Sequence, residues 1–442
     1  MSTKTAPGKS PQKKNRSGFA LLQRMGRSLM LPIASLPAAA LLLRIGQPDM
    51  LGADGLSQYI PGLQPIADVM AKAGGAVLGN LALLFAIGVA VGFARKSDGS
   101  TGLAAVIGYL VFTEVLTVMA VWFGAGDPEN RTINYGVLGG IAVGILTAVL
   151  YQKYYRVKLP TYLAFFGGRR FVPIVTAAAS ILLAVAMSII YPVFNWLVND
   201  KLGGFIMAHG DNPATGFVFG TVNRLLIPFG LHHLLNSIPW FQLGECQNAA
   251  GEIIHGDITC FLSGVDGTNA WTGSFMTGFF PIMMFALPGA AFAFYRTARP
   301  ENRKVVGGVM VSLALTSFLT GVTEPIEFAF AYVAFPLYLV HALLTGTSLA
   351  IVNYLGIKSG FGFSAGLFDY LLNFTKAAGL SGGALQVLLL IVIGLIYFAI
   401  YYFLFSFAIK KWNLATPGRE TEEGSDATAS VFDDAQNASS KS

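Results

Sequence analysis

The stretch LQVLLLIVIGLIYFAIYYFLFSFAI occupies residues 385–409 and contains no charged side chain. About 20 consecutive apolar residues in an α-helix cross the roughly 30 Å of hydrocarbon in a bilayer. Apolar runs of comparable length recur along the chain, near residues 29–45, 75–94, 102–123, 136–151, 172–197, 216–235, 273–295, 305–320 and 326–350. This recurrence predicts an all-α polytopic membrane protein with about ten transmembrane helices.

The overall composition points to the same class. Of 442 residues, 54% are hydrophobic and 12% are charged, and the mean hydropathy is +0.60. A soluble domain carries roughly 25% charged residues. Disordered chains and coiled coils are excluded, and the net charge of +6 is too small to indicate nucleic-acid binding.

Basic residues are concentrated on every second connection between the apolar runs. Residues 1–28 carry seven bases and no acid, and residues 152–170 carry five bases and no acid. The connection 46–74 instead has three aspartates and one lysine. By the positive-inside rule the N-terminus is cytoplasmic and the fifth span ends outside. Lys410 and Lys411 place the C-terminus in the cytoplasm as well.

Two stretches, 236–272 and 351–384, are rich in Gly, Pro and polar residues. They are too polar to face lipid and too apolar for simple loops. Irregular backbone at membrane depth is tolerated where it is buried in protein or lines a cavity. We therefore expect broken or re-entrant backbone in these stretches, with the binding site in this second half of the chain.

The two cysteines, Cys246 and Cys260, form no Cys-x-x-Cys pair and have no metal-ligand spacing to the histidines. We expect two free thiols, no metal site and no cofactor.

Polar groups interrupt the apolar sequence at NRLLIPFGLHH (223–233) and GVTEPIEF (321–328). A charge at membrane depth costs roughly 2.5–3.5 kcal/mol, so Arg224, Glu324 and Glu327 must be paired or face water. Arginine donors, imidazoles and carboxylates suit a ligand with many hydroxyl groups, such as a sugar. A structural ion pair between Arg224 and one of the two glutamates is the alternative. We also expect Pro325 to keep Glu324 out of helical geometry.

These stretches, together with FFGGRRFVPIV (165–175), HGDI (255–258) and ATPGRE (415–420), resemble the membrane component, enzyme IIC (EIIC), of the phosphoenolpyruvate-dependent sugar phosphotransferase system (PTS), glucose superfamily. The similarity runs from about 18 to 420. LLNSIPWFQLGE (234–245) and GFFPIMMFALPGAA (278–291) look like the N-acetylglucosamine branch.

The resemblance implies roles for individual residues. It implies that Arg224 and Glu324 hold sugar hydroxyls, with Thr323 beside Glu324, and that His232 lies near the C6 hydroxyl. His232 and Glu324 are therefore the predicted catalytic residues. Asn236 and Ser237 are candidates for contact with an acetamide group. His233 follows His232 and is expected to point away from it on a helix. A structural role and a site role both stay open for His233.

The resemblance further implies a homodimer in a bacterial plasma membrane. Its expected parts are a disordered basic tail (1–28), a scaffold and dimerisation half (29–200), a substrate-binding half (201–412) and a disordered acidic tail (413–442). The chain has no Cys-x-Thr-Arg-Leu-Arg motif of an EIIB domain. The sugar is therefore expected to be phosphorylated at O6 by a separate phospho-EIIB protein, with EIIA, HPr and enzyme I upstream.

Three alternatives stay open at this point. The substrate of the same family could be glucose. The chain could be an ion-coupled secondary transporter, with Glu114 and Glu324 as coupling sites, or a membrane sensor without transport. Outside the site, Glu114 is expected to be buried in the scaffold. His341 and Asp369 are expected to have structural roles, and His255 and Asp257 to make polar contacts that fix their loop.

Overall fold

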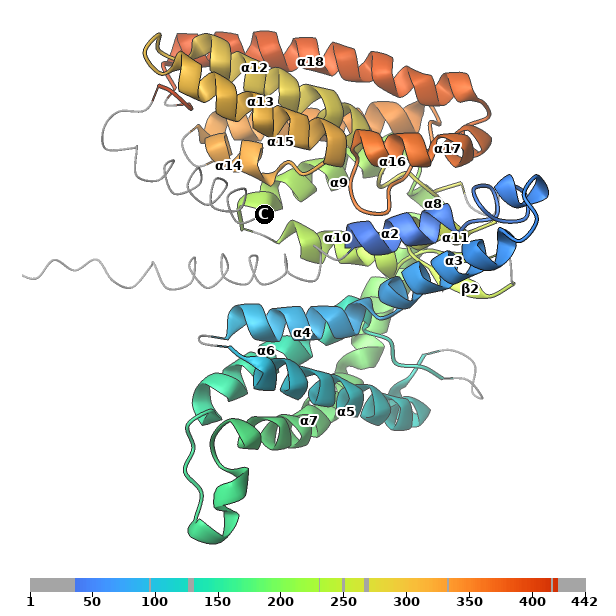
Figure 1. Ribbon diagram of the computed structural model, residues 1–442, viewed down its shortest axis with the longest axis vertical. Coiled ribbons are helices and arrows are strands. Elements are labelled where there is room, and N and C mark those ends of the chain that lie inside the picture. Colours follow the sequence, from blue (N-terminus) through green and yellow to red (C-terminus); the bar gives the residue numbers. More distant parts are fainter. Residues whose placement is uncertain are drawn as a thin grey trace, which may run out of the picture.

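The computed structural model describes residues 36–419, except residues 95–96, 126–130, 230, 249–250, 266–269, 332–333 and 415. The predicted tail 1–28, the start of the first apolar run and residues 420–442 lie outside the described residues. Within them the chain is largely helical, as predicted (Figure 1). A two-stranded antiparallel ribbon pairs β1 (Glu245–Gln247) with β2 (Ile253–His255) and departs from a purely helical fold.

The helices of the first half of the chain are α2 (Leu36–Ile45), α3 (Gln64–Gly79), α4 (Leu81–Phe93), α5 (Gly99–Phe123), α6 (Gly136–Tyr154) and α7 (Phe171–Phe194). Helices α4 to α7 form a layer at one end of the molecule (Figure 1). Within the layer α5 packs on α7 and α4 packs on α6. Short 3₁₀ segments lie at Leu56–Gln58, Thr161–Phe166 and Gly168–Arg170, and a π-helix follows α7 at Asn195–Gly203.

The second half begins with short, interrupted helices. These are α8 (Gly204–His209), α9 (Pro213–Leu226), a 3₁₀ turn (Ile227–Phe229), α10 (His232–Phe241) and α11 (Asp257–Ser263). The helices that follow are a π-helix (Pro281–Ala286) leading into α12 (Leu287–Thr297), then α13 (Arg303–Thr320), α14 (Glu324–Ala331), α15 (Phe335–Tyr354), α16 (Leu367–Leu372), α17 (Phe374–Leu380) and α18 (Ala384–Trp412). Here α15 packs on α9, and α12 packs on both α13 and α18.

Six described helices are long and apolar enough to cross a membrane: Gly99–Phe123, Gly136–Tyr154, Gly168–Gly203, Arg303–Thr320, Phe335–Tyr354 and Ala384–Trp412. A seventh candidate is the pair α3 and α4, which are bent by 54° relative to each other. The membrane-spanning class is confirmed. The expected runs near 216–235 and 326–350 are each broken into separate helices, at Ile227–Phe229 and between α14 and α15.

Two expectations from the sequence are wrong. Cys246 and Cys260 form a disulfide rather than two free thiols. Their separation of 14 residues carries no pairing signal, and the β1–β2 ribbon brings them together. Glu114 is exposed on the surface of the single chain instead of buried in the scaffold, because it points out of the α4–α7 layer.

The described fold continues into the segment expected to be a tail. Thr416, Pro417 and Gly418 are buried. Arg419 donates to the backbone oxygen of Thr297 over 3.0 Å, and Asn302 donates to that of Gly418 over 3.3 Å. These bonds hold residues 416–419 against the connection between α12 and α13.

Candidate functional site

The two polar stretches found in the sequence meet at a cavity in the second half of the molecule. One wall comes from the end of α9 and the start of α10, and another from the connection between α13 and α14. The cavity contains about 790 Å³ of empty space, part of it open to solvent. The predicted residues that line it are Arg224, His232, His233, Asn236, Thr323 and Glu324.

The chain is broken at both walls by residues that favour breaks. Pro228, in the 3₁₀ turn between α9 and α10, has no backbone N–H to continue a helix. At the other wall, Gly321 ends α13 in the left-handed region, with φ of +74°. A Cβ atom there would lie 2.6 Å from the Ser364 hydroxyl oxygen, so only glycine fits.

Helix α14 begins at Glu324, which corrects the expectation that Pro325 keeps Glu324 out of the helix. Proline is tolerated in the first turn, where its missing N–H would have no intrahelical partner. The Glu327 amide donates to the backbone oxygen of Thr323 over 3.0 Å and closes this turn. Glu324 therefore lies at the start of α14, on the cavity wall.

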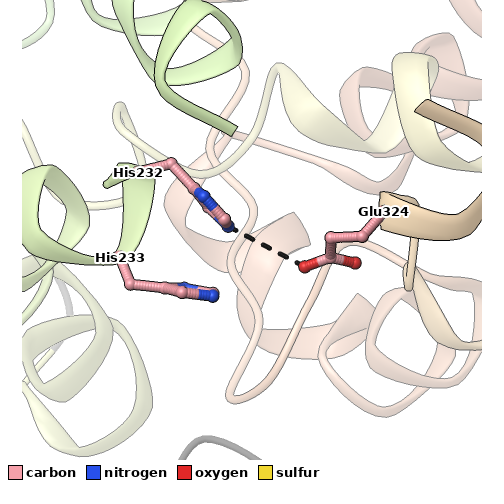
Figure 2. A group of neighbouring side chains, drawn as sticks. All are labelled: His232, His233 and Glu324. Atoms are coloured by element: carbon pink, nitrogen blue, oxygen red, sulfur yellow. Dashed lines mark ion pairs between the residues drawn. The ribbon is translucent and has the colours of Figure 1, made fainter. Parts of the chain in front are cut away.

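His232, His233 and Glu324 form one cluster on the cavity wall (Figure 2). The His232 Nε2 atom lies 3.8 Å from Glu324 Oε1, and the centroids of the two imidazole rings are 3.8 Å apart. The sequence-based expectation that His233 points away from His232 is therefore wrong. The two histidines open α10, and both rings extend toward Glu324.

The same cluster is the group of described residues best suited to hold a metal ion. Its three ligand atoms lie within 4.8 Å of one another. Two imidazoles and a carboxylate are a ligand set found in catalytic zinc sites. The groups also suit a sugar, because a carboxylate accepts from hydroxyl groups and an imidazole both donates and accepts.

Arg224 pairs with Glu327 rather than with Glu324. Its Nη1 atom donates to Glu327 Oε1 over 2.8 Å and to Thr323 Oγ1 over 3.3 Å. The arginine is 2% exposed and the glutamate is fully buried. The guanidinium carbon lies 4.8 Å from the centroid of the Phe279 ring. The sequence-based expectation that these charges are paired is thus confirmed for Arg224 and Glu327.

The pairing leaves part of the arginine available. Within the described part of the chain, the Nε and Nη2 atoms of Arg224 have no hydrogen-bond partner. Because an unpaired buried donor costs about 1–3 kcal/mol, such groups in a cavity wall favour a ligand that accepts from them. The ion pair and the ligand site are therefore compatible alternatives, not exclusive ones.

Amide groups add to the same wall. Asn223 donates through Nδ2 to Asn236 Oδ1, and both side chains are buried. Both residues line the cavity, whereas Ser237 is buried outside its lining. Asn223 was not predicted from the sequence as a site residue, although it directly precedes Arg224.

The other polar candidates have structural contacts. Asp257 accepts from the backbone amides of Gly273 and Phe275 over 2.5 and 3.0 Å. Asp369 accepts from the Gly362 amide over 2.8 Å. His255 lies 3.9 Å from Glu245 across the β-ribbon, away from the cavity residues. These contacts confirm the structural roles expected for Asp257 and Asp369.

Comparison with known proteins identifies relatives of the whole chain. Residues 26–346 match the family described as phosphotransferase system, EIIC. The chain is 50% identical to a Streptomyces coelicolor protein named PTS system N-acetylglucosamine-specific EIIC component, over 96% of this chain and 98% of the relative. It is 47% identical to an Escherichia coli protein named PTS system N-acetylglucosamine-specific EIICBA component, over 92% of this chain and 57% of the relative.

A solved structure shares the fold. It is the transporter that forms the IIC component of an N,N'-diacetylchitobiose-specific phosphotransferase system. The TM-score is 0.52 at 15% sequence identity, and the match covers 90% of this chain and 94% of the other. The family match over most of the chain, together with 50% identity to a relative covered almost completely, shows that this protein belongs to the EIIC family of the phosphotransferase system.

Proposed function

We propose that the protein takes up N-acetylglucosamine and that the bound sugar is phosphorylated at O6 by a separate phospho-EIIB protein. The observation that carries the proposal is the convergence of Arg224, Asn236, His232 and Glu324 on one cavity. The names of the Streptomyces coelicolor and Escherichia coli relatives support the choice of sugar.

In this proposal each residue has a chemical task. The unpartnered Arg224 donors and the Glu324 carboxylate bind sugar hydroxyls, with Thr323 holding Arg224. His232 takes the proton of the C6 hydroxyl as that oxygen attacks phosphorus. The new O–P bond forms while the S–P bond of the EIIB phosphocysteine breaks, and the cysteine leaves as a thiolate. His233 and Asn236 complete the sugar contacts.

The separate donor is supported by the name of the Streptomyces coelicolor relative, an EIIC component, which matches this chain over 98% of its own length. EIIA, HPr and enzyme I act upstream of the donor, and the phosphorylated sugar is released into the cytoplasm. The N- and C-termini lie on that same side of a bacterial plasma membrane, and about ten spans with two re-entrant hairpins cross or enter it.

We also propose a homodimer formed through the scaffold half (29–200). Glu114 lies in the middle of the spanning helix α5 and is exposed on the single chain. A carboxylate facing hydrocarbon is costly, and a second copy packed on this face lowers that cost by shielding Glu114 from lipid and supplying hydrogen-bond donors to it. Residues 201–412 then form the half that carries the sugar across.

The proposed function is tested with purified protein in vesicles, labelled N-acetylglucosamine and a phosphorylated EIIB protein. Labelled 6-phosphate inside the vesicles, formed only with the EIIB protein, is the expected result. Free sugar accumulating without EIIB under an ion gradient would instead identify a secondary transporter. Stronger competition by glucose than by unlabelled N-acetylglucosamine would reassign the substrate.

Two substitutions test the binding residues in the same assay. Glu324→Gln and Arg224→Ala are expected to abolish sugar binding, because each removes a charged partner of the hydroxyl groups. His232→Ala is expected to retain binding better than phosphoryl transfer. Normal uptake by the Glu324→Gln variant would remove this residue from the site.

A further inference from the structure

Behind the cavity wall lies a chain of buried polar contacts that the sequence did not indicate. Glu327 Oε1 accepts from Arg224 Nη1 over 2.8 Å and lies 3.3 Å from His341 Nε2. The other ring nitrogen of His341, Nδ1, lies 2.9 Å from the Tyr401 hydroxyl oxygen. Glu327, His341 and Tyr401 are all fully buried. The chain of contacts therefore runs from the cavity through α14 and α15 to α18.

The chemistry of the groups sets the direction of the hydrogen bonds. An ionised carboxylate only accepts, so His341 donates its Nε2 hydrogen to Glu327. In the neutral imidazole the Nδ1 atom is then an acceptor for the Tyr401 hydroxyl. Tyr401 thereby holds the histidine in the form that donates to Glu327, and the histidine holds the carboxylate oxygen that binds Arg224.

This arrangement controls where the arginine points. Arg224 has several rotatable bonds, and its guanidinium is fixed at Nη1 by Glu327 and lies against the Phe279 ring. Its backbone oxygen also accepts from the Tyr338 hydroxyl group. Because one edge of the guanidinium is held from behind, the direction of its Nε and Nη2 donors is fixed; these two atoms have no hydrogen-bond partner among the described residues and belong to a side chain that lines the cavity. Fixing these donors in advance lowers the ordering cost of binding.

We propose that Glu327, His341 and Tyr401 are positioning residues that aim the free donors of Arg224 at the hydroxyl oxygens of the sugar. The inference rests on the proposed function, since it requires that the cavity binds a sugar. None of the three residues touches the ligand. Their effect is on affinity, and the phosphoryl-transfer step itself does not pass through them.

The test compares His341→Phe, which keeps a ring but loses both hydrogen bonds, with His341→Gln, whose amide can donate to Glu327 again. Sugar Kd is measured on the purified protein, and KM and kcat are measured with phospho-EIIB. His341→Phe is expected to raise Kd and KM roughly tenfold, the loss of one charge-assisted hydrogen bond. The kcat is expected to stay within about twofold, and His341→Gln to restore most of the affinity.

Thr347→Val is the matched control. Thr347 lies on α15 and its hydroxyl is 2.7 Å from the Tyr397 hydroxyl on α18, so this variant also loses a hydrogen bond between the same two helices. Its Kd is expected to stay at the wild-type value. If Thr347→Val weakens binding as much as His341→Phe, general packing of α15 on α18 explains the effect and the proposal is overturned.

A double variant shows whether the effect passes through Arg224. In an Arg224→Lys background the lysine has no forked edge to orient, so adding His341→Phe is expected to change Kd less than twofold. A full tenfold further loss would overturn the proposal. Tyr401→Phe supplies a second, smaller perturbation if His341→Phe fails to fold. Wild-type protein that binds no N-acetylglucosamine would instead overturn the proposed function, and the inference with it.

Discussion

Arg224 combines two roles that the sequence presented as alternatives. One nitrogen of its guanidinium is held by Glu327, and two others have no hydrogen-bond partner in the part of the chain that the structure describes. A planar fork with five donors allows this division, which a lysine would not. The sequence located the arginine correctly but not its partner, because Glu324 and Glu327 are equally plausible until the backbone of α14 is known.

The disulfide between Cys246 and Cys260 is a second feature that appears only in three dimensions. It joins β1 to α11, and both cysteines belong to a small buried cluster with Trp271. A disulfide that closes a loop of about 15 residues contributes roughly 3 kcal/mol by restricting the unfolded chain.

We therefore expect reductant to lower the thermal unfolding midpoint of the wild-type protein, measured by fluorescence on purified protein. The double variant Cys246→Ser, Cys260→Ser should have the lower midpoint from the start and should not respond to reductant. An identical wild-type midpoint with and without reductant would contradict a stabilising disulfide.

At the scale of single elements, the N-terminus of α5 is capped by a side chain and by a capping box. Asp98 is its N-cap and accepts from the Ser100 amide over 3.0 Å, while Thr101 completes a capping box. Arg169, in the connection between α6 and α7, lies 2.6 Å from the same carboxylate. The contact places the connections before α5 and before α7 at the same end of the layer, as the alternating charges predicted.

The hydrogen bond from the Ser100 side chain, supported by the Ser100 amide and by Arg169, lowers the pKa of Asp98 below its usual value of 3.8. A group whose pKa is lower in the folded state stabilises the fold above its unfolded pKa and loses this contribution as pH falls through the folded value. The contribution of Asp98 should be complete at neutral pH and should begin to decrease below about pH 4, as the pH approaches the lowered folded-state pKa.

Asp98→Ala is expected to lower stability by about 1 kcal/mol at pH 7, the usual cost of losing an N-cap. Asp98→Asn should lose less, because the amide oxygen can still cap the helix. Thermal unfolding of the three proteins at pH 7 and pH 3.5 measures this. A difference between wild type and Asp98→Ala that is as large at pH 3.5 as at pH 7 would rule out the ionised cap.

At the scale of the whole molecule, the β-ribbon lies beside connections predicted to be external, whereas the 3₁₀ segment Thr161–Phe166 lies in a connection predicted to be cytoplasmic. Glu245 and His255 of the ribbon share a cavity with Asn134 and Asp200, in connections predicted to be external. An external ribbon would place the disulfide on the oxidising side of the membrane, where such bonds persist.

Labelling of intact cells tests this orientation. Both native cysteines are in the disulfide, so one introduced thiol reports its own position. A membrane-impermeant maleimide should label His255→Cys, whose native side chain is 45% exposed, from outside. It should label Tyr162→Cys, at a residue 83% exposed, only after the membrane is permeabilised. The reverse pattern would invert the topology.

The sequence alone determined the class of the protein and the composition of its site. Long apolar runs and alternating loop charges follow from the length of a membrane-spanning helix and from the cost of moving charge across a bilayer, and both are local properties. Charged residues in such runs pointed to Arg224 and Glu324, and the resemblance to the EIIC family added His232 and Thr323. All four residues line one cavity.

Only the tertiary structure decided which groups pair. Glu327 with Arg224, His341 with Tyr401, and Cys246 with Cys260 are contacts between separate elements. His341 stood in the sequence as a lone histidine in an apolar run, and Glu114 looked buried because it lies in the middle of another apolar run. Their surroundings depend on how helices pack against one another, and that packing leaves no periodic signal along the chain.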